Sequence, residues 1–307
     1  MKTMPFDSVH NTRTSLEAAG YICTREIATV IFLAASTRKP VLVEGPAGVG
    51  KTELAKAISR SLDREMIRLQ CYEGLDEAKA LYEWEYAKQL LYTQVVKDKN
   101  ADVVTGAANL TDAVERIAGQ EDAFFSERFM LPRPLLQAIR SAAPTVLLVD
   151  EVDKSDPEFE AFLLEVLSDY QVTIPELGTV KASHIPFVVL TSNSYRDMSD
   201  ALKRRCIHLY IDYPDRATEL AIVAEKVPGI AQDLARQMVT AMARIRDLDL
   251  KKTPSISETL DWAQSLIALQ VETLSAEVVA DTLNVICKHR EDARLVREQA
   301  DRVANFG

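Results

Sequence analysis

The chain has 307 residues, of which 47% are hydrophobic, and it contains only 10 glycines and 12 prolines. This composition excludes a disordered chain and predicts a globular protein with one large or two ordinary domains. The formal net charge of −10 argues against a nucleic acid as the main partner, because phosphate contacts require a surplus of Lys and Arg on one face.

No apolar run in the sequence approaches the roughly 18 residues that cross a bilayer, and the first residues do not begin a signal peptide. We therefore expect a cytoplasmic protein without a membrane span. The four cysteines, at positions 23, 71, 206 and 287, are far apart and form no Cys-x-x-Cys pair. This spacing indicates neither a zinc site nor a disulfide framework, and we expect buried, reduced thiols.

The N-terminal residues 1–20 are polar and without a clear pattern, and we expect them to form an arm with one helical turn. Residues 25–37 then carry apolar side chains, among them Ile27, Val30 and Ile31, at helical spacing. This pattern predicts a helix that packs one face on a sheet.

The stretch from residue 41 to residue 52 is a short apolar run that ends in glycines and continues as a helix-forming sequence. Its three glycines allow backbone torsions that turn successive N–H groups toward a phosphate. Lys51 adds a mobile positive charge for the β and γ phosphates. The Thr52 hydroxyl is a hard oxygen ligand for Mg²⁺, and the helix that begins there directs its positive dipole end at the same anion.

This spacing fits the Walker A pattern completely, although a tight strand-to-helix turn that contains Gly-Lys-Thr by chance is an alternative. The predicted nucleotide-binding residues of the loop are Gly45, Pro46, Ala47, Gly48, Val49, Gly50, Lys51 and Thr52.

A second stretch, residues 146–151, strengthens this interpretation. It has four apolar residues followed by Asp150 and Glu151, the form of a Walker B strand. A buried parallel strand is continuously apolar, and an α/β sheet binds ligands at the carboxyl ends of its strands. Asp150 would hold the Mg²⁺ shell, partly through water, and Glu151 would polarise the attacking water. The two motifs together predict an enzyme that hydrolyses a nucleoside triphosphate.

Between residues 72 and 129 the alternation of strands and helices breaks down. Residues 66–71 predict a strand, but residues 78–96 are rich in Tyr, Trp and Leu and helical in propensity, and a further helix is predicted at 110–118. Such a long excursion predicts an insertion on the core. Its aromatic side chains could be internal packing or could face a partner or a pore. A short helix at 135–142 then precedes the Walker B strand.

After Glu151, the pair Asp156 and Pro157 has the form of a helix start. Residues 171–174 and 180–182 suggest a β-hairpin, and residues 185–190 suggest another buried strand. Asn193 follows that strand, where it could orient the water that Glu151 activates. The alternative is that Asn193 only forms a turn at the end of the strand.

Two arginines, Arg204 and Arg205, precede an apolar strand predicted at 207–211. Surface arginines are usually solvated, but this location suggests an arginine finger that reaches the γ-phosphate of a neighbouring subunit. From residue 215 onward the sequence predicts no strand and forms a separate helical domain. Its four amphipathic helices are expected at about 215–226, 230–247, 256–270 and 275–293.

Taken together, these motifs resemble the AAA+ ATPases over nearly the whole chain. The resemblance implies an α/β P-loop core with a parallel sheet and a C-terminal all-helical lid. The implied boundaries are an arm at 1–20, a nucleotide-binding domain at 21–213 and a lid at 214–307. An insert at about 74–125 and a hairpin at about 170–184 resemble the helix-2 insert and pre-sensor-1 hairpin of the MoxR branch. Within it, the stretch from Arg204 to Asp215 is most similar to the subgroup of CoxD, CbbQ and NorQ, with CoxD closest.

The resemblance implies a homo-oligomer, usually a hexameric ring with ATP at its interfaces, a partner with a von Willebrand factor A domain, and a protein client. The implied task is chaperone-like: remodelling or maturing a metalloenzyme, such as the molybdenum hydroxylase carbon monoxide dehydrogenase. Asn193 would be sensor 1, and Arg205 is a better finger candidate than Arg204. No sensor-2 residue is assigned, because Ile256 stands where an arginine would be expected.

Three alternatives stay open. The protein could be an activase of another enzyme, of the Rubisco or nitric oxide reductase type. A nucleic-acid-dependent motor could use the same core, but the net charge and the lack of a basic stripe disfavour it. A nucleotide-dependent scaffold that hydrolyses slowly is disfavoured by the intact pair Asp150 and Glu151.

Overall fold

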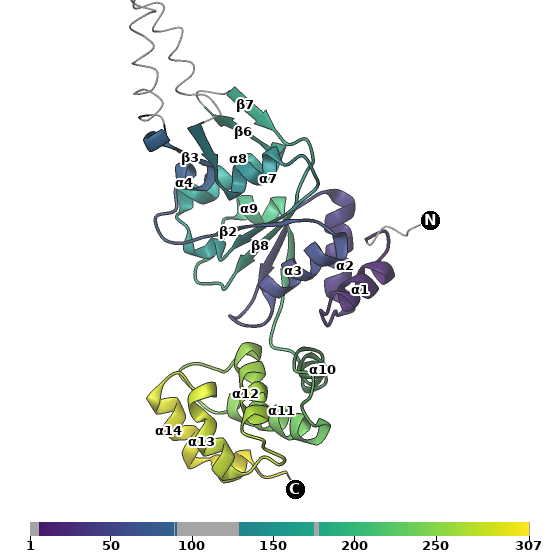
Figure 1. Ribbon diagram of the computed structural model, residues 1–307, viewed down its shortest axis with the longest axis vertical. Helices are drawn as coiled ribbons and strands as arrows, with labels where there is room; N and C mark the ends of the chain where they lie inside the picture. Colours follow the sequence, from purple (N-terminus) through teal and green to yellow (C-terminus); the bar gives the residue numbers. More distant parts are fainter. Residues whose placement is uncertain (1–5, 89, 91–128, 175–177, 307) are drawn as a thin grey trace, which may run out of the picture.

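The computed structural model describes residues 6–88, 90, 129–174 and 178–306. It has an α/β core followed by a bundle of helices, and one chain segment connects β9 of the core to α10 of the bundle (Figure 1). The core begins with α1 (Val9–Ala18), α2 (Arg25–Thr37), β1 (Val41–Glu44), α3 (Lys51–Leu62), β2 (Met66–Gln70), α4 (Glu77–Leu81), β3 (Tyr82–Trp84), β4 (Met130–Pro132) and α7 (Pro134–Arg140).

The core continues with β5 (Val146–Asp150), the short 3₁₀ helix η2 (Val152–Lys154), α8 (Pro157–Asp169), β6 (Gln171–Ile174), β7 (Gly178–Lys181), β8 (Phe187–Ser192), α9 (Asp200–Arg205) and β9 (Ile207–Tyr210). The bundle consists of α10 (Arg216–Lys226), α11 (Gln232–Arg246), α12 (Ile256–Ala268), α13 (Ala276–Ile286), α14 (Arg290–Glu298) and α15 (Ala300–Val303).

Within the described residues, the main sheet has five parallel strands in the order β2-β5-β8-β1-β9. Because the strands run the same way, their carboxyl ends share one edge, where Glu44, Asp150 and Ser192 end β1, β5 and β8. The strand β8 lies between β1 and β5. Residues that follow β8 are therefore placed between the two predicted phosphate motifs, and the predicted parallel α/β fold is confirmed.

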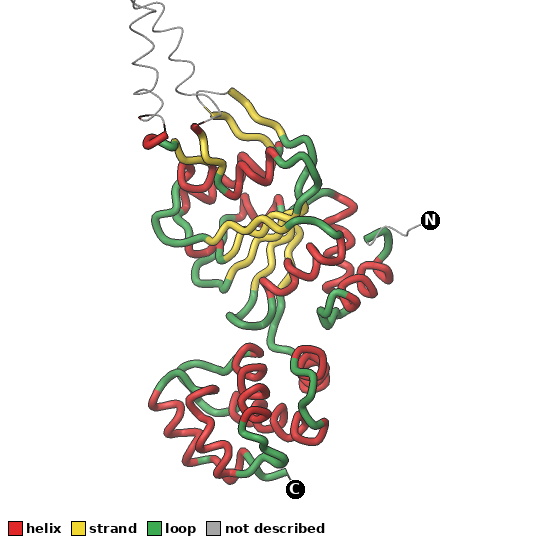
Figure 2. The backbone as a smooth tube through the Cα atoms, in the orientation of Figure 1, coloured by secondary structure: helices red, strands yellow, loops and turns green. Residues whose placement is uncertain are grey.

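Helices cover both faces of this sheet (Figures 1 and 2). One face packs against α1, α2 and α3 and includes Val41 and Val43 of β1. The other face, to which β1 contributes Leu42, packs against α4, α7, α8 and α9. Alternate residues of β1 thus point to opposite faces, and both faces are buried, which explains why the strand is apolar throughout.

The helix α1 corrects the expectation of an arm with one helical turn. It is 10 residues long and begins at Val9, and the side chain of the N-cap residue Ser8 accepts a hydrogen bond from the N–H of Asn11 at 3.1 Å. Leu16 is 0% exposed and belongs to the core of α2 and α3. The other buried position of α1 is the polar Thr12, which donates to the Ser8 carbonyl at 2.8 Å. A helix with one apolar and one polar buried residue shows little periodicity, so the sequence pattern missed it.

The helix expected over residues 78–96 is wrong at residues 82–84. The chain leaves α4 and forms β3, which pairs antiparallel with β4 and places Tyr82 opposite Pro132. The rings of Tyr82 and Trp84 are 5.7 Å apart and lie partly buried against the core, so these two aromatic residues serve as internal packing. Most of the predicted insertion, including the helix expected at 110–118, lies outside the described residues.

The C-terminal bundle contains the four predicted helices, but the fourth is shorter than expected. It ends at Ile286, Cys287 is extended, and α14 and α15 follow. The sequence missed this break because Lys288 and His289 are neither Gly nor Pro. The bundle has its own core around Trp262, whose indole N–H donates to Thr282 Oγ1 at 2.8 Å.

The predicted β-hairpin is present as β6 and β7, with Val172 opposite Val180. All four cysteines are buried free thiols, as expected, and burial raises the pKa of Cys71 to about 12. None of the helices in the described ranges is both long enough and apolar enough to cross a membrane.

We expect Leu16→Ala to lower the free energy of unfolding by about 2–5 kcal/mol, because it removes a fully buried side chain and leaves a cavity beside α2 and α3. Thr14 lies on the exposed side of the same helix, so Thr14→Ala should cost less than about 0.5 kcal/mol. Urea unfolding followed by circular dichroism would measure both variants. Equal, small losses would mean that α1 is only a loosely attached arm.

Candidate functional site

The phosphate-binding loop leaves β1 and enters α3 as the sequence predicts. Gly45, Gly48 and Gly50 have φ angles of 148°, 77° and 98°, a region that favours glycine. A Cβ at Gly45 would lie 1.9 Å from the carbonyl oxygen of Ile211, and a Cβ at Gly48 would lie 2.1 Å from Ser255 Oγ. The loop conformation therefore favours glycine at all three positions. At Gly45 and Gly48 glycine is also required because the chain segments just before α10 and α12 approach the loop closely.

Lys51 turns back into this loop. Its Nζ donates to the carbonyls of Gly45 at 2.7 Å and Pro46 at 2.6 Å, and the residue is only 6% exposed. Burial lowers the pKa of Lys51 to about 8, although Asp153 and Asp150 act in the opposite direction. The helix α3 has no side-chain cap, so its first N–H groups are available to a phosphate together with this amine.

Asp150, at the end of β5, is the most heavily bonded carboxylate of the site. Its Oδ1 accepts from the Thr52 hydroxyl at 3.2 Å and from the Thr191 hydroxyl. Its Oδ2 accepts from Arg68 Nε at 3.0 Å and Arg68 Nη2 at 2.6 Å. The structure thus brings the predicted pair Thr52 and Asp150 together. It adds Arg68 and Thr191, which the sequence analysis did not assign.

Glu151 follows directly and has a left-handed backbone, with φ of 55°. Its N–H donates to Thr191 Oγ1 at 2.9 Å, which supports this uncommon conformation. Its carboxylate accepts from Asn193 Nδ2 at 3.0 Å, Gln70 Nε2 at 2.9 Å and Lys154 Nζ at 2.7 Å. The Glu151 side chain is 30% exposed, so water can reach its carboxylate, and the three donors fix its position.

Asn193 reaches Glu151 because β8 lies between the two motif strands. Its backbone is fixed by Asp153, whose Oδ2 accepts from the N–H of Asn193 at 3.0 Å and the N–H of Tyr195 at 2.8 Å. Asp153 is fully buried, and its Oδ1 has no hydrogen-bond partner among the described residues. The sequence predicted Asn193 from its place after a strand, but it gave no signal for the support by Asp153.

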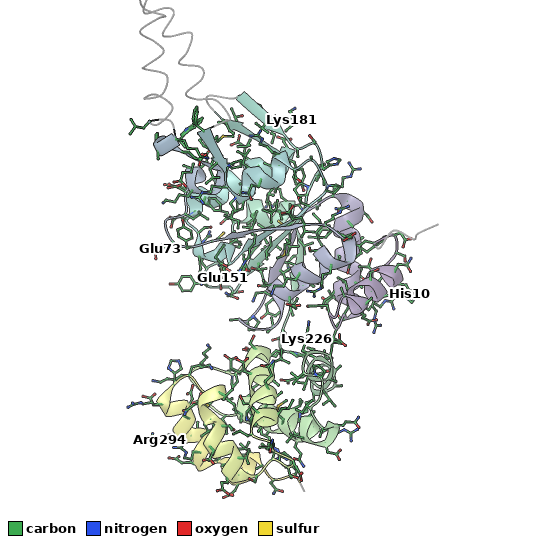
Figure 3. All side chains as sticks on the ribbon, in the orientation of Figure 1. His10, Glu73, Glu151, Lys181, Lys226 and Arg294 are labelled. Atoms are coloured by element: carbon green, nitrogen blue, oxygen red, sulfur yellow. The ribbon has the colours of Figure 1, made fainter. Side chains whose placement is uncertain are left out.

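A cavity of about 670 Å³ opens beside the loop, between the core and the bundle. Figure 3 shows Glu151 at the edge of the core nearer the bundle, and Lys226, the last residue of α10, on the side of the bundle that faces the core. The cavity wall includes Gly48 and Gly50 of the loop and the apolar side chains of Ile22, Ile27, Ile222 and Leu260. An apolar slot that continues from a phosphate loop fits a nucleotide base and ribose.

The bundle side of the cavity contains Ile256, the position where the sequence analysis expected a sensor-2 arginine and found none. Among the described residues that line the cavity, Lys226 is the only basic one, and it donates to Glu53 at 3.2 Å. Arg246 does not line the cavity. It forms an ion pair with the buried Glu219 of α10 at 2.6 Å, and its guanidinium carbon lies 5.6 Å from the ring centre of Tyr213, in the segment that connects β9 to α10. This network was not predicted.

Arg204 and Arg205 lie at the other edge of the sheet, away from this cavity. They end α9 immediately before β9, whose first residue is paired with the start of β1. Arg205 Nε donates to Ser168 Oγ at 2.7 Å. Both side chains are exposed, and Arg204 makes no side-chain hydrogen bond or ion pair with the described residues. The structure therefore does not bring the two arginines to the nucleotide site of their own chain.

The residues at the carboxyl edge fit Mg²⁺ and ATP. Thr52 and Asp150 present hard oxygen atoms at hydrogen-bond distance from each other, which suits a Mg²⁺ ion bound directly by the hydroxyl and through water by the carboxylate. The loop and Lys51 would hold the phosphates. Bound Mg²⁺ would neutralise charge on the β and γ phosphates. Glu151 would accept a proton from water, and Asn193 would orient Glu151 and that water.

A parallel sheet that joins a Walker A loop, a Walker B pair and a polar residue just after the strand between them is typical of a P-loop nucleoside triphosphatase. The model of the family described as "ATPase family associated with various cellular activities (AAA)" matches residues 41–213. This range covers more than half of the chain and includes every predicted site residue. The chain belongs to this AAA family of ATPases.

Three relatives share parts of this sequence. Chaperone protein ClpB 2 from Parasynechococcus marenigrum (strain WH8102) is 34% identical over 159 residues, which are 51% of this chain and 14% of ClpB 2. The gas vesicle ATPase GvpN from Haloferax mediterranei is 27% identical over 218 residues, 68% of this chain and 57% of GvpN. An uncharacterized protein from Staphylococcus aureus (strain bovine RF122 / ET3-1) is 25% identical over 259 residues, 80% of this chain and 84% of that protein.

This chain thus spans about one seventh of ClpB 2 and just over half of GvpN. A solved structure of a RuvB mutant from Thermotoga maritima covers 93% of this chain and 73% of its own, with a TM-score of 0.47 and 16% identity.

We expect Glu151→Gln to reduce ATP turnover by at least about 100-fold, because an amide cannot accept the proton of the attacking water. ATP binding should stay nearly unchanged, since the hydrogen bonds of the Glu151 carboxylate go to Gln70, Lys154 and Asn193 and not to the phosphate loop. Phosphate release and binding of a fluorescent ATP analogue would measure the two effects. Glu165→Gln, at an exposed position of α8, is the matched control. Normal turnover in Glu151→Gln would remove Glu151 from the mechanism.

Proposed function

We propose that this chain is an ATP-driven remodelling protein that works as a ring, usually of six copies, on a protein client. The observation that carries the proposal is the separation of the catalytic parts: Lys51, Asp150, Glu151 and Asn193 meet at one edge of the sheet, while Arg204 and Arg205 lie at the opposite edge. The four residues of β1 alone separate the edges by about 13 Å. An arginine finger at that distance would act on the nucleotide of a neighbouring copy.

Charge complementarity between the two edges supports a head-to-tail contact of this kind. A second cavity of about 550 Å³ lies near the starts of β1, β2 and β8, and its lining residues include Arg38, Lys39, Arg64 and His184 and no described Asp or Glu. These four side chains form no ion pair with the described residues. The nucleotide cavity, in contrast, is lined by several exposed carboxylates: Glu26, Asp212 and Asp215.

We call the surface around the second cavity the basic edge and the exposed carboxylates of the nucleotide cavity the acidic rim. Contact between the basic edge of one copy and the acidic rim of the next is a heterologous interface, which closes into a ring when the rotation between copies permits. In the proposed ring, the segment from Arg204 to Arg205 enters the nucleotide site of the next copy. Because a guanidinium is planar and always charged, it would stabilise charge that develops on the γ-phosphate.

We further propose that the chain is a member of the MoxR branch, closest to CoxD, and that it matures or remodels a metalloenzyme with a partner that has a von Willebrand factor A domain. The hairpin of β6 and β7 before β8 agrees with the resemblance to that branch. A chaperone-like task is supported by the likeness to ClpB 2, which is named a chaperone, and to GvpN, which is named an ATPase. The client would be identified by copurification with the Glu151→Gln variant, which holds ATP.

We expect the mass of the protein in solution to rise to about six times 34.2 kDa when ATP and Mg²⁺ are added to the Glu151→Gln variant. Bound nucleotide would complete the interface between the basic edge and the acidic rim. Light scattering after size-exclusion chromatography measures this mass, and the same protein in EDTA is the reference. A monomer in both conditions would contradict the ring, unless a copurified partner restores assembly.

We expect Arg205→Ala to lower ATP turnover of the assembled protein by about 10³-fold, while ATP binding is retained. Arg236→Ala, at an exposed position of α11, should leave turnover unchanged. Mixing Arg205→Ala subunits with Lys51→Ala subunits should restore part of the activity, because the second type still supplies its arginine to the first. No recovery on mixing would argue that Arg205 acts within its own chain or only supports the fold.

A further inference from the structure

Arg68 contacts the Walker B aspartate although it belongs to neither phosphate motif. It lies on β2, the neighbour of β5, two residues before Gln70, which is opposite Asp150 in the register. Half of the Arg68 side chain is exposed, at 50%, whereas the Asp150 side chain is 4% exposed. The buried carboxylate thus receives a cation that reaches it from the solvent side of the sheet edge.

Together with two threonine hydroxyls, Arg68 occupies the hydrogen-bond acceptor sites of Asp150. A carboxylate has about four lone-pair sites. Two are occupied by the hydroxyls of Thr52 and Thr191 on Oδ1, and two by Nε and Nη2 of Arg68 on Oδ2. The Thr52 hydroxyl also lies 3.4 Å from Oδ2. Asp150 therefore has no lone pair left for a water of a Mg²⁺ shell unless one donor withdraws.

Of the three donor residues, Arg68 has the most freedom to withdraw. Thr191 is 1% exposed and is also fixed by the N–H of Glu151. Thr52 can bind Mg²⁺ through its oxygen and still donate its proton to Asp150. Arg68 is half exposed, and its guanidinium can turn toward water or keep its contact with Gln70 Oε1, at 2.5 Å.

We propose that Arg68 is a positioning residue that acts as an internal counter-cation: it neutralises Asp150 while no Mg²⁺-nucleotide is bound and withdraws from Oδ2 when Mg²⁺-ATP binds. Arg68 and Mg²⁺ then compete for the same carboxylate, so Arg68 raises the Mg²⁺ concentration that tight nucleotide binding needs. This inference rests on the proposed binding of Mg²⁺-ATP, and it is independent of the ring and of the client.

The first test is a Mg²⁺ titration, started in EDTA, of the binding of a fluorescent, non-hydrolysable ATP analogue. We expect Arg68→Ala to need about fivefold less Mg²⁺ for half-maximal binding, and to bind the analogue less tightly than the unmodified protein in EDTA. Arg68→Lys keeps the charge but cannot donate two bonds from one planar group. Its Mg²⁺ requirement should therefore lie between those of the unmodified protein and Arg68→Ala. An unchanged Mg²⁺ requirement in Arg68→Ala would overturn the proposal. A higher requirement would overturn it as well, because Arg68 would then assist Mg²⁺ binding.

The second test separates competition from a general effect on the fold. Without nucleotide, Arg68→Ala leaves a buried carboxylate without its cation, and we expect the melting temperature to fall by about 4 °C or more. At saturating Mg²⁺ and analogue, this difference should shrink, because Arg68 has already withdrawn from Asp150 in the unmodified protein. An equal difference in both conditions would overturn the proposal in favour of a structural role.

Arg13→Ala is the matched control, because the ion pair of Arg13 with Glu17 is exposed on α1, outside the nucleotide site. It should change neither the Mg²⁺ requirement nor the nucleotide dependence of melting. If the unmodified protein binds no analogue even in Mg²⁺, then the proposed function fails together with the inference. If it binds normally and Arg68→Ala behaves as the control does, only the role of Arg68 is wrong.

Discussion

The burial of the Asp150 carboxylate is the constraint on which the rest of the site depends. A buried carboxylate is costly unless every oxygen is paired. Its donors come from three places, the first turn of α3 (Thr52), β2 (Arg68) and β8 (Thr191). The phosphate loop and three strands must therefore be correctly aligned for Asp150 to be stable, so the interaction that makes the site possible also fixes the register of the sheet around it.

Strand order then decides which residues can cooperate. Because β8 is between β1 and β5, Thr191 reaches both Asp150 and the backbone of Glu151, and Asn193 reaches the Glu151 carboxylate. From the other side of β5, Gln70 reaches the second oxygen of Glu151. Glu151, the proposed general base, is thus held by residues of two neighbouring strands. Its left-handed backbone is possible because these contacts compensate a conformation that glutamate seldom adopts.

The sequence alone predicted those parts of the site that depend on local chemistry. Glycines followed by Lys51 and Thr52, and an apolar run followed by Asp150, are contiguous patterns, and both are where they were expected. Arg68 and Asp153 were missed because their roles depend on which strands are neighbours, and the order of strands in a sheet cannot be read from the sequence. α1 was missed for a different reason: its buried face includes the polar Thr12, and burial there comes from α2 and α3 rather than from its own pattern.

A parallel sheet has two chemically different edges, and this asymmetry would link catalysis to the proposed assembly. At the carboxyl edge the helix that follows a strand begins, so its free N–H groups attract phosphate; at the amino edge the preceding helix ends, so its free carbonyls attract cations. Arg38, at the end of α2, and Arg64, just after α3, follow this rule, and so do Arg204 and Arg205 in the last turn of α9. The same geometry that draws an anion to one edge therefore collects arginines at the other. A single copy does not bring the two together, whereas two copies placed head to tail could, and the proposed dependence of turnover on a neighbour rests on this direction of the strands.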